Sequence, residues 1–397
     1  MEKSKVQDGV HSMVPREQMC ESAQKLRDTY ELKPDIPFFK GEFGYNSRWG
    51  VDACYYCLEQ WRQQGLPEDA DMVEYFDYDL QGSHCLGQLG ACEAEFEPYF
   101  EDKVVEDRGK YEVIQDIAGR YVLVFKGRRQ GFMPEYIDHP VKDMKSWEEN
   151  AKWRLDPKSG GRYLDLEERM QKARIEAAKG KIITQDHVGA YMYLRSLIGP
   201  EKLLYAFHDM PDVIHECMKA WLELSDHVIA QHQQYVTIDE IFFDEDICYN
   251  HGPLISPDMM REFLFPYYQQ LIGNLRSRQI DKTRNVHIQV DSDGYVVPII
   301  ELYHDQIGLN VMSPFEVASG CDAVAIGRLY PDLVMTGGID KRVLAEGKEA
   351  IDEHLGYILP TMRKRGGYIP TCDHGVPAEV SLDNYVYYRR RTVELGA

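Results

Sequence analysis

Several features are missing from this sequence, and each absence excludes a class of protein. With a formal net charge of -21 over 397 residues, the chain has no excess of basic residues for binding nucleic acid or an anionic membrane. No uninterrupted apolar run approaches the roughly 20 residues of a membrane span. The N-terminal "MEKSKVQDGVHSMVPREQ" has no apolar signal-peptide core, so we expect a cytoplasmic location. Nine cysteines, an odd number, fit reduced thiols better than a disulfide framework.

The chain also has no internal repeat and no low-complexity segment, but short apolar strands alternate with helical patterns along it. The predicted strands are 35–44, 180–189, 238–248, 285–294, 307–314, 333–340 and 366–375. Helical patterns follow at 201–234, 256–278, 295–304, 316–326, 341–365 and 381–395, and Ser256 before Pro257 is typical of a helix N-cap. This alternation predicts the α/β class with a parallel sheet, closed as a (β/α)8 TIM-type barrel, with a doubly wound open sheet as the alternative.

Residues 50–175 do not follow this alternation. Within them, "KYEVIQDIAGRYVLVFKGRRQG" (110–131) alternates like an antiparallel meander with a turn near Gly119. We therefore predict a single barrel domain over residues 1–397. An inserted α+β subdomain at 50–175, after the first strand, would form a lid or wall beside the pocket.

Acids, histidines and a cysteine follow nearly every predicted strand. In chain order they are Glu42; Asp186 and His187; Asp244, Glu245 and Asp246; Asp291 and Asp293; Glu316; Asp340; and Cys372, Asp373 and His374. The carboxyl ends of barrel strands meet at one rim, where functional groups of this fold lie. So many carboxylates would repel each other unless protons or a cation compensate them, and a bound metal is the economical explanation.

Each of these residues also has a simpler interpretation. Glu316 or Asp340 alone would be explained as a cap of the following helix. His187 and His374 alone would be ordinary buried histidines, and Cys372 alone an inert thiol. The metal hypothesis therefore rests on convergence at one rim.

Four segments resemble the uroporphyrinogen decarboxylase-like superfamily. They are "DEDICYNHGPLISPDMMREFLFPYYQQL" (244–271), "HDQIGLNVMSPFEVASGCDAV" (304–324), "GGIDKRVLAEGKEAI" (337–351) and "GGYIPTCDHGVPAEVSLDNYVYY" (366–388). The resemblance implies a barrel with its site at the carboxyl-end mouth. True decarboxylases of this superfamily carry an arginine-rich motif that grips porphyrinogen carboxylates. The corresponding stretch here, "PFFKGEFGYNSRWGVD" (37–52), has Arg48 as its only arginine, so that substrate is not expected.

The other branch of the superfamily contains cobalamin-dependent methyltransferases. Those acting on thiols resemble zinc enzymes with His-x-Cys-Gly after the fourth strand and a later cysteine. By motif position these fall on Asp291-Ser292-Asp293-Gly294 and on Cys372. Two aspartates make the site harder and richer in oxygen, which suits activation of an ether oxygen better than activation of a thiol. The chain thus resembles the methyl-donor-specific subunits of corrinoid-dependent O-demethylases.

This resemblance implies a site and a set of partners. Zinc held by Asp291, Asp293 and Cys372 with Glu245 would polarise the ether oxygen; alternatively, His374 or His187 would protonate it. The remaining predicted site residues are Asp244 and Glu245 as catalytic acids and, around the substrate, Glu42, Tyr45, Trp49, Asp186, Phe315 and Glu316. The expected substrate is a small methoxylated, aromatic compound.

The chain contains no Asp-x-His-x-x-Gly motif followed by a Rossmann-like half, so the corrinoid is expected on a separate protein. The resemblance also allows a homodimer. Two competing hypotheses are a decarboxylase or lyase of another small acid, which would use the acidic rim as proton donor, and a barrel that only binds its ligand. Intact acid, histidine and cysteine strand ends speak against the last of these.

Overall fold

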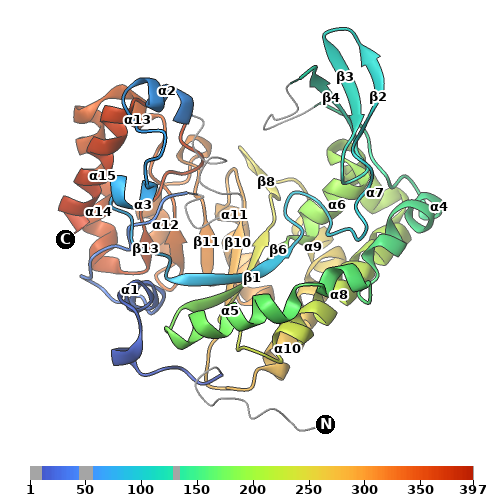
Figure 1. The fold of residues 1–397 in the computed structure, drawn as a ribbon, viewed down its shortest axis with the longest axis horizontal. Helices are drawn as coiled ribbons and strands as arrows, with labels where there is room; N and C mark the ends of the chain where they lie inside the picture. Colours follow the sequence, from blue (N-terminus) through green and yellow to red (C-terminus); the bar gives the residue numbers. More distant parts are fainter. Residues whose placement is uncertain (1–10, 44–56, 128–134, 397) are drawn as a thin grey trace.

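The central element of the molecule is a curved parallel sheet, seen near the middle of Figure 1. The computed structural model describes residues 11–43, 57–127 and 135–396. In this part, seven strands pair in the order β1-β6-β7-β10-β11-β12-β13, and every neighbouring pair is parallel. They are β1 (Ser83–Leu89), β6 (Ile182–Val188), β7 (Glu240–Asp244), β10 (His287–Asp291), β11 (Val311–Ser313), β12 (Val334–Thr336) and β13 (Tyr368–Ile369).

The ring is closed between β13 and β1 by residues 36–43, which are not a strand, contrary to the strand predicted at 35–44. The Glu42 carboxylate accepts a hydrogen bond from the backbone N–H of Cys372, just after β13, at 2.7 Å. The Lys40 carbonyl accepts one from Asp79, shortly before β1, at 2.9 Å. Pro37 has no N–H to donate to a ladder, and the Glu42 side chain replaces a backbone acceptor. The predicted α/β barrel is thus confirmed, with an irregular eighth segment.

The predicted insertion at 50–175 is corrected by β1, which lies inside that range and belongs to the barrel sheet. The strand was missed because its sequence, SHCLGQL, is only partly buried and has no apolar run. Its pairing with β6 is also irregular between Cys85 and Gln88, and Gly87 between them has a φ of +132°.

A separate antiparallel sheet follows β1 in the chain and stands off the barrel in Figure 1. It consists of β2 (Lys103–Arg108), β3 (Tyr111–Gln115), β4 (Tyr121–Phe125) and β5 (Glu135–Asp138). The meander predicted over 110–131 is confirmed by β3 and β4, whose connection contains Gly119 with a φ of +76°. A two-stranded ribbon, β8 (Cys248–Tyr249) and β9 (Gly252–Pro253), rises beyond β7.

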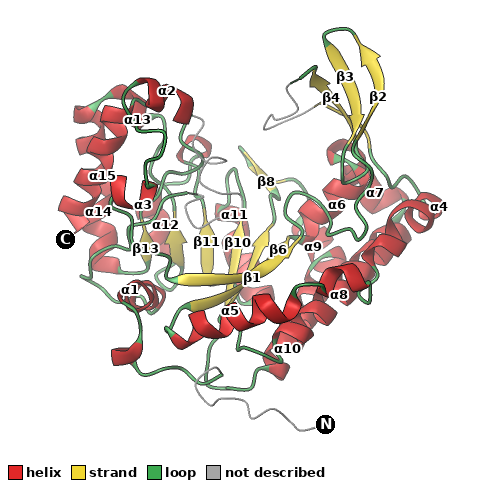
Figure 2. Cartoon of the chain, in the orientation of Figure 1, coloured by secondary structure: helices red, strands yellow, loops and turns green. Residues whose placement is uncertain are grey.

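Helices surround the sheet, as Figure 2 shows in red. In chain order they are α1 (Glu21–Tyr30), α2 (Leu58–Gln63), α3 (Met72–Tyr75), α4 (Met144–Ser146), α5 (Leu166–Ala178), α6 (Ala190–Ile198), α7 (Pro200–Asp209), α8 (Pro211–His232), α9 (Pro257–Phe263), α10 (Phe265–Arg278), α11 (Val297–Ile307), α12 (Ala323–Leu329), α13 (Val343–Glu346), α14 (Lys348–Arg365) and α15 (Leu382–Gly396). Ser256 caps α9 as predicted, accepting a hydrogen bond from Met259. Among the described residues, no helix combines the length and apolar character needed to cross a membrane.

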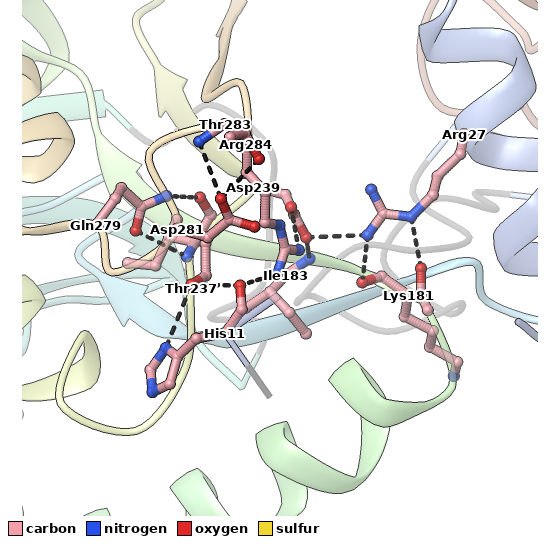
Figure 3. A network of polar contacts seen from close by, with 12 residues as sticks. His11, Arg27, Lys181, Ile183, Thr237, Asp239, Gln279, Asp281, Thr283 and Arg284 are labelled. Atoms are coloured by element: carbon pink, nitrogen blue, oxygen red, sulfur yellow. Dashed lines mark hydrogen bonds and ion pairs between the residues drawn. The ribbon is translucent and has the colours of Figure 1, made fainter. Parts of the chain in front are cut away.

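The amino ends of β6 and β7 carry a buried polar network (Figure 3). The Asp239 carboxylate accepts hydrogen bonds from the Arg27 guanidinium at 3.1 Å and from Arg284 on its other oxygen. The same carboxylate accepts the backbone N–H of Ile183 at 2.9 Å, and Arg284 also donates to the carbonyl of His11. The two arginines and the aspartate are nearly inaccessible to solvent, so this network ties α1, β6 and the start of β10 together.

Candidate functional site

A cavity of about 220 Å³ runs inside the barrel. It is lined by inward-facing residues of all seven sheet strands and of the closing segment, chiefly Phe39, Phe43, Cys85, Thr184, Asp186, Glu240, Phe242, Gln289, Asp291, Ser313, Thr336 and Thr371, together with Tyr30 and Glu42. Among the described lining residues there is no lysine, arginine or histidine. The strand pattern explains this wall, because alternate side chains of a strand point to the same face.

Three carboxylates of the wall accept hydrogen bonds from neutral groups. Asp186, predicted at the site, accepts the Cys85 thiol at 3.1 Å, and Asp291 accepts the Ser313 hydroxyl. Glu240 accepts the Tyr30 phenol at 2.6 Å. Burial, and then the neighbouring charges of Asp186 and Asp239, raise the pKa of Glu240 to about 8. Most of the Glu240 side chains are therefore protonated at neutral pH.

Glu42 is the fourth acid of the wall and is buried. Its carboxylate accepts hydrogen bonds from the backbone N–H groups of Cys372 and Phe43, at 2.7 and 2.8 Å. The Tyr385 hydroxyl donates to the other oxygen at 2.8 Å. The structure thus places Glu42 at the cavity, as predicted, but its contacts hold the closing segment against β13.

The carboxyl-end mouth brings together Asp293 and His374, two predicted site residues. The His374 Nε2 atom lies 3.6 Å from an Asp293 carboxyl oxygen. Burial, and then the charges of Asp246, Asp291 and Glu316, raise the pKa of Asp293 to about 9, against a smaller opposing effect of Lys341. Burial and Lys341 lower the pKa of His374. At neutral pH the pair therefore consists of a protonated carboxyl and a neutral imidazole.

The surroundings of His374 fix its position. Its ring stacks on Phe43, with centroids 4.8 Å apart. In the loop beyond β11, Glu316 accepts the backbone N–H of Gly294 at 2.9 Å and the Lys341 ammonium at 3.2 Å. Lys341 also lies 3.8 Å from Asp373, whose other oxygen accepts the backbone N–H of Val317. Glu316 therefore connects the loops of the mouth through these hydrogen bonds. It was predicted to contact substrate, and it lies beside the Asp293–His374 pair.

Three predicted site residues face the surrounding core instead of the cavity, and these predictions were wrong. Glu245 is fully buried and accepts hydrogen bonds from Tyr268 and Tyr303, on α10 and α11. His187 contacts Ser225 and packs against Trp221 with the two rings tilted, and both partners lie on α8. Phe315 has no exposed surface and belongs to the core. Strand alternation explains His187, which follows the inward Asp186 and therefore points outward.

Asp244, the remaining predicted catalytic acid, ends β7 beside Asp291, the last residue of β10. It is buried, and its carbonyl accepts the N–H of Gly189 at 2.6 Å. Tyr45 and Trp49, both predicted to contact substrate, lie outside the described residues.

The four predicted zinc ligands do not form one group. Glu245 faces the helices, and Cys372 is fully buried in the core, where burial and the charges of Glu42 and Asp373 raise the pKa of its thiol. Over the described ranges 11–43, 57–127 and 135–396, no group of three or more histidine, cysteine, aspartate or glutamate residues is arranged to hold a metal. The predicted zinc set therefore does not fit this arrangement.

Sequence reasoning missed Tyr30, Glu240, Gln289 and Ser313, all of which line the cavity. The signal that could have found the strand residues is alternation: Glu240 is two positions before Phe242 and four before Asp244 on the same face of β7. The sequence prediction considered only the residues at the strand ends, so it covered the rim and not the cavity wall.

Comparison with known families identifies the fold. Residues 137–390, more than half of the chain, match the family described as uroporphyrinogen decarboxylase (URO-D). The chain belongs to the uroporphyrinogen decarboxylase family. This membership agrees with the barrel and with the mouth at the carboxyl ends of its strands.

Solved structures give a second comparison for this family member. A structure described as a methyltransferase from Methanosarcina mazei is 14% identical and matches over 94% of this chain and 98% of that chain, with a TM-score of 0.54, which shows a shared fold. A structure described as a putative vitamin-B12 independent methionine synthase from Listeria monocytogenes, 13% identical, covers 57% of this chain and 68% of that chain. Its TM-score of 0.31 is too low to show a shared fold. A comparison with curated protein sequences finds no match.

Proposed function

We propose that this protein transfers a methyl group from a small methylated compound to cob(I)alamin carried by a separate corrinoid protein. The observation that carries the proposal is the Asp293–His374 pair at the mouth, 3.6 Å apart, with the cavity beneath it. Membership of the uroporphyrinogen decarboxylase family and the shared fold of the Methanosarcina mazei methyltransferase support the same reaction type.

The chemical difficulty of such a reaction lies in the leaving group. Cob(I)alamin supplies a strong nucleophile, but an alkoxide or phenolate leaves poorly unless its developing charge is stabilised. Asp293 holds a proton at neutral pH because of its raised pKa, so it can donate that proton to the leaving oxygen. His374, neutral and held by Phe43, then hydrogen-bonds the ionised carboxylate.

The cavity wall disfavours the family's name-giving substrate type. A porphyrinogen with several carboxylates needs several cations to hold it, and no described residue that lines the cavity is basic. A methoxylated compound, the donor expected from the sequence, needs no cluster of cations to bind it. The neutral acid at the mouth is then used for proton donation and the barrel interior for donor binding.

The test uses the purified full chain with free cob(I)alamin under anaerobic, reducing conditions. Methoxy-aromatics, methylamines and methylthiols are offered in turn, and formation of methylcob(III)alamin is followed by its absorbance. We expect one donor class to react, and His374→Gln to slow the reaction by about 100-fold or more.

The matched control is His304→Gln, because His304 is exposed on α11 and pairs with its exposed neighbour Asp305. Its rate should equal that of the unaltered protein. No methylation with any donor, together with carbon dioxide release from uroporphyrinogen, would replace the proposal by decarboxylation.

A further inference from the structure

The amino end of the barrel has a second cavity, of about 410 Å³, where β10 and β11 begin. The loops from α10 to β10 and from α11 to β11 form its wall. Three cations and three amides supply the polar groups of this wall: Arg276, Lys282 and Arg284, with Gln279, Asn285 and Asn310. None of its described lining residues is acidic or aromatic. In a chain with a formal net charge of -21, such a wall is unusual and favours a negatively charged ligand.

Arg284 belongs to a buried network in which positive charge is in excess. Arg284 and Arg27 both donate to the Asp239 carboxylate, so two cations share one counter-charge (Figure 3). The other acceptors of the two arginines in the described part of the chain are uncharged backbone carbonyls. The Nε–H group of Arg284 is buried and meets no acceptor among the described residues. An anion in the cavity would balance this excess of positive charge.

Arg276 and Lys282 add two cations that no carboxylate of the described residues reaches within ion-pair distance. The Arg276 guanidinium extends to Gly308 on the other loop, where an added Cβ atom would lie 3.5 Å from its Nη2 atom. The Lys282 ammonium donates to the carbonyls of Arg276 and Ser277, at 3.3 and 2.5 Å. Carbonyls at the end of a helix carry only partial charge, so Lys282 remains a net cation.

Asp281 is the acid of the loop between α10 and β10, and it does not line the cavity. Its carboxylate accepts the backbone N–H and the hydroxyl of Thr283, at 2.9 and 2.7 Å. These hydrogen bonds lower the pKa of Asp281 more than the charge of Arg284 does. Asp281 is therefore ionised and offsets one cation. Positive charge remains in excess even when Asp281 and Asp239 are set against Arg27 and the three cations of the wall.

A phosphoryl group has the chemistry that this wall lacks. It carries up to two negative charges on oxygens that accept the N–H groups of arginine in pairs, and side-chain amides are further donors. A monocarboxylate would bring a single charge. The described wall has no aromatic ring on which a nucleobase could stack, so it favours a small phosphate over a nucleotide.

We propose that this cavity binds a phosphoryl group, either inorganic phosphate or a small phosphate ester. The cavity lies where β10 and β11 begin, whereas the Asp293–His374 pair lies beyond the end of β10. The anion is therefore a second ligand, distinct from the methyl donor, and its binding does not rest on the proposed reaction. It joins the two loops to the network around Asp239.

The test is isothermal titration of the full chain at about pH 8, where a phosphate monoester carries close to two charges, at constant ionic strength. The probes are inorganic phosphate, glycerol 3-phosphate, glycerol and acetate. We expect both phosphates to bind at least about tenfold more tightly than acetate, and glycerol not to bind. Tighter binding of glycerol 3-phosphate would assign the site to an organic phosphate, and equal or tighter binding of inorganic phosphate to the phosphoryl group alone. Acetate or glycerol binding as tightly as the phosphates would overturn the inference.

Variants locate the anion. Arg276→Gln should weaken the binding of both phosphates by about tenfold, because a charge-assisted hydrogen bond is lost, and Lys282→Gln should weaken it in the same direction. Arg276 is exposed, so its replacement is compatible with folding. Arg261→Gln is the matched control, because Arg261 is about half exposed on α9 and its partner Asp258 is 94% exposed. Phosphate affinity that is the same in both cavity variants as in the control would place the anion elsewhere and contradict the inference.

Discussion

The two ends of the barrel place an aspartate in opposite surroundings. At the amino end, Asp239 lies between Arg27 and Arg284 and accepts hydrogen bonds from both (Figure 3). At the carboxyl end, Asp293 lies beside His374, and loss of solvent together with the neighbouring acids raises the pKa of Asp293 to about 9.

This contrast separates a structural charge from a reactive one. A buried carboxylate held by two cations stays ionised and connects the elements that supply those cations. A carboxyl surrounded by acids keeps its proton and can give it up when a reaction demands it. Residue type alone does not distinguish the two, because both are aspartates close to strand ends.

The largest effect is expected at the mouth. Asp293→Asn should lower the turnover of the proposed methyl transfer by about 100- to 10,000-fold, because an amide cannot donate the proton. Its stability to urea at pH 7 should not fall, since the acid that it replaces is already uncharged there. Turnover equal to that of the unaltered protein would exclude Asp293 as proton donor.

The matching change at the amino end should affect folding instead. Asp239→Asn leaves two arginines buried without their shared counter-charge, and we expect the free energy of unfolding to fall by about 3–5 kcal/mol. The exposed Asp258→Asn variant should change it by less than about 0.5 kcal/mol. Urea denaturation measures both. Turnover per folded Asp239→Asn molecule should be unaltered, and a loss no larger than that of the control would contradict a structural role for the network.

Glu245 offers an intermediate case, a buried acid behind the mouth with a pKa raised to about 7 by burial. The folded protein holds this proton more tightly than the unfolded chain does. Its contribution to stability is therefore complete below about pH 4.5 and is lost as the pH rises through about 7, with a slope of up to about 1.4 kcal/mol per pH unit. Glu245→Gln should flatten the stability profile between pH 5 and 7. An unchanged slope would show that another group governs this range.

The smallest effect concerns Lys341, a cation near the acid pair. Lys341 opposes the rise in the pKa of Asp293, so Lys341→Gln should raise that pKa further, by up to about one unit. The alkaline limb of the rate profile would move to higher pH by the same amount. Lys348→Gln is the control, because Lys348 pairs with the exposed Asp383 away from the mouth. A downward shift would contradict the assigned sign.

Local patterns in the chain were enough to predict much of the fold. The alternation of apolar strands and helices predicted a barrel, Ser256 marked a helix start, and a hairpin was expected around Gly119. Asp293 and His374 were both predicted at the rim because they follow strands, and the structure brings them together.

The direction in which each side chain points could not be predicted from the sequence in the same way. Asp244 and Glu245 are neighbours in sequence, yet Asp244 ends a barrel strand beside Asp291 whereas Glu245 packs between Tyr268 and Tyr303. A shift of one residue in a strand reverses which face a side chain occupies, and only the paired register settles it. Strand alternation also explains why His187 points away from the cavity.

Sequence periodicity thus predicted the barrel and its acidic mouth, because strand and helix patterns are local properties, and four sequence segments carried the family resemblance. Tertiary structure alone decided which acids share space and which of them have a cation beside them. The different surroundings of the two aspartates arise from distant parts of the chain: Arg27 and Arg284 bind Asp239, whereas burial and the acids Asp246, Asp291 and Glu316 act on Asp293. Electrostatic environment is a property of the assembled fold, so strand-end position alone could not predict it.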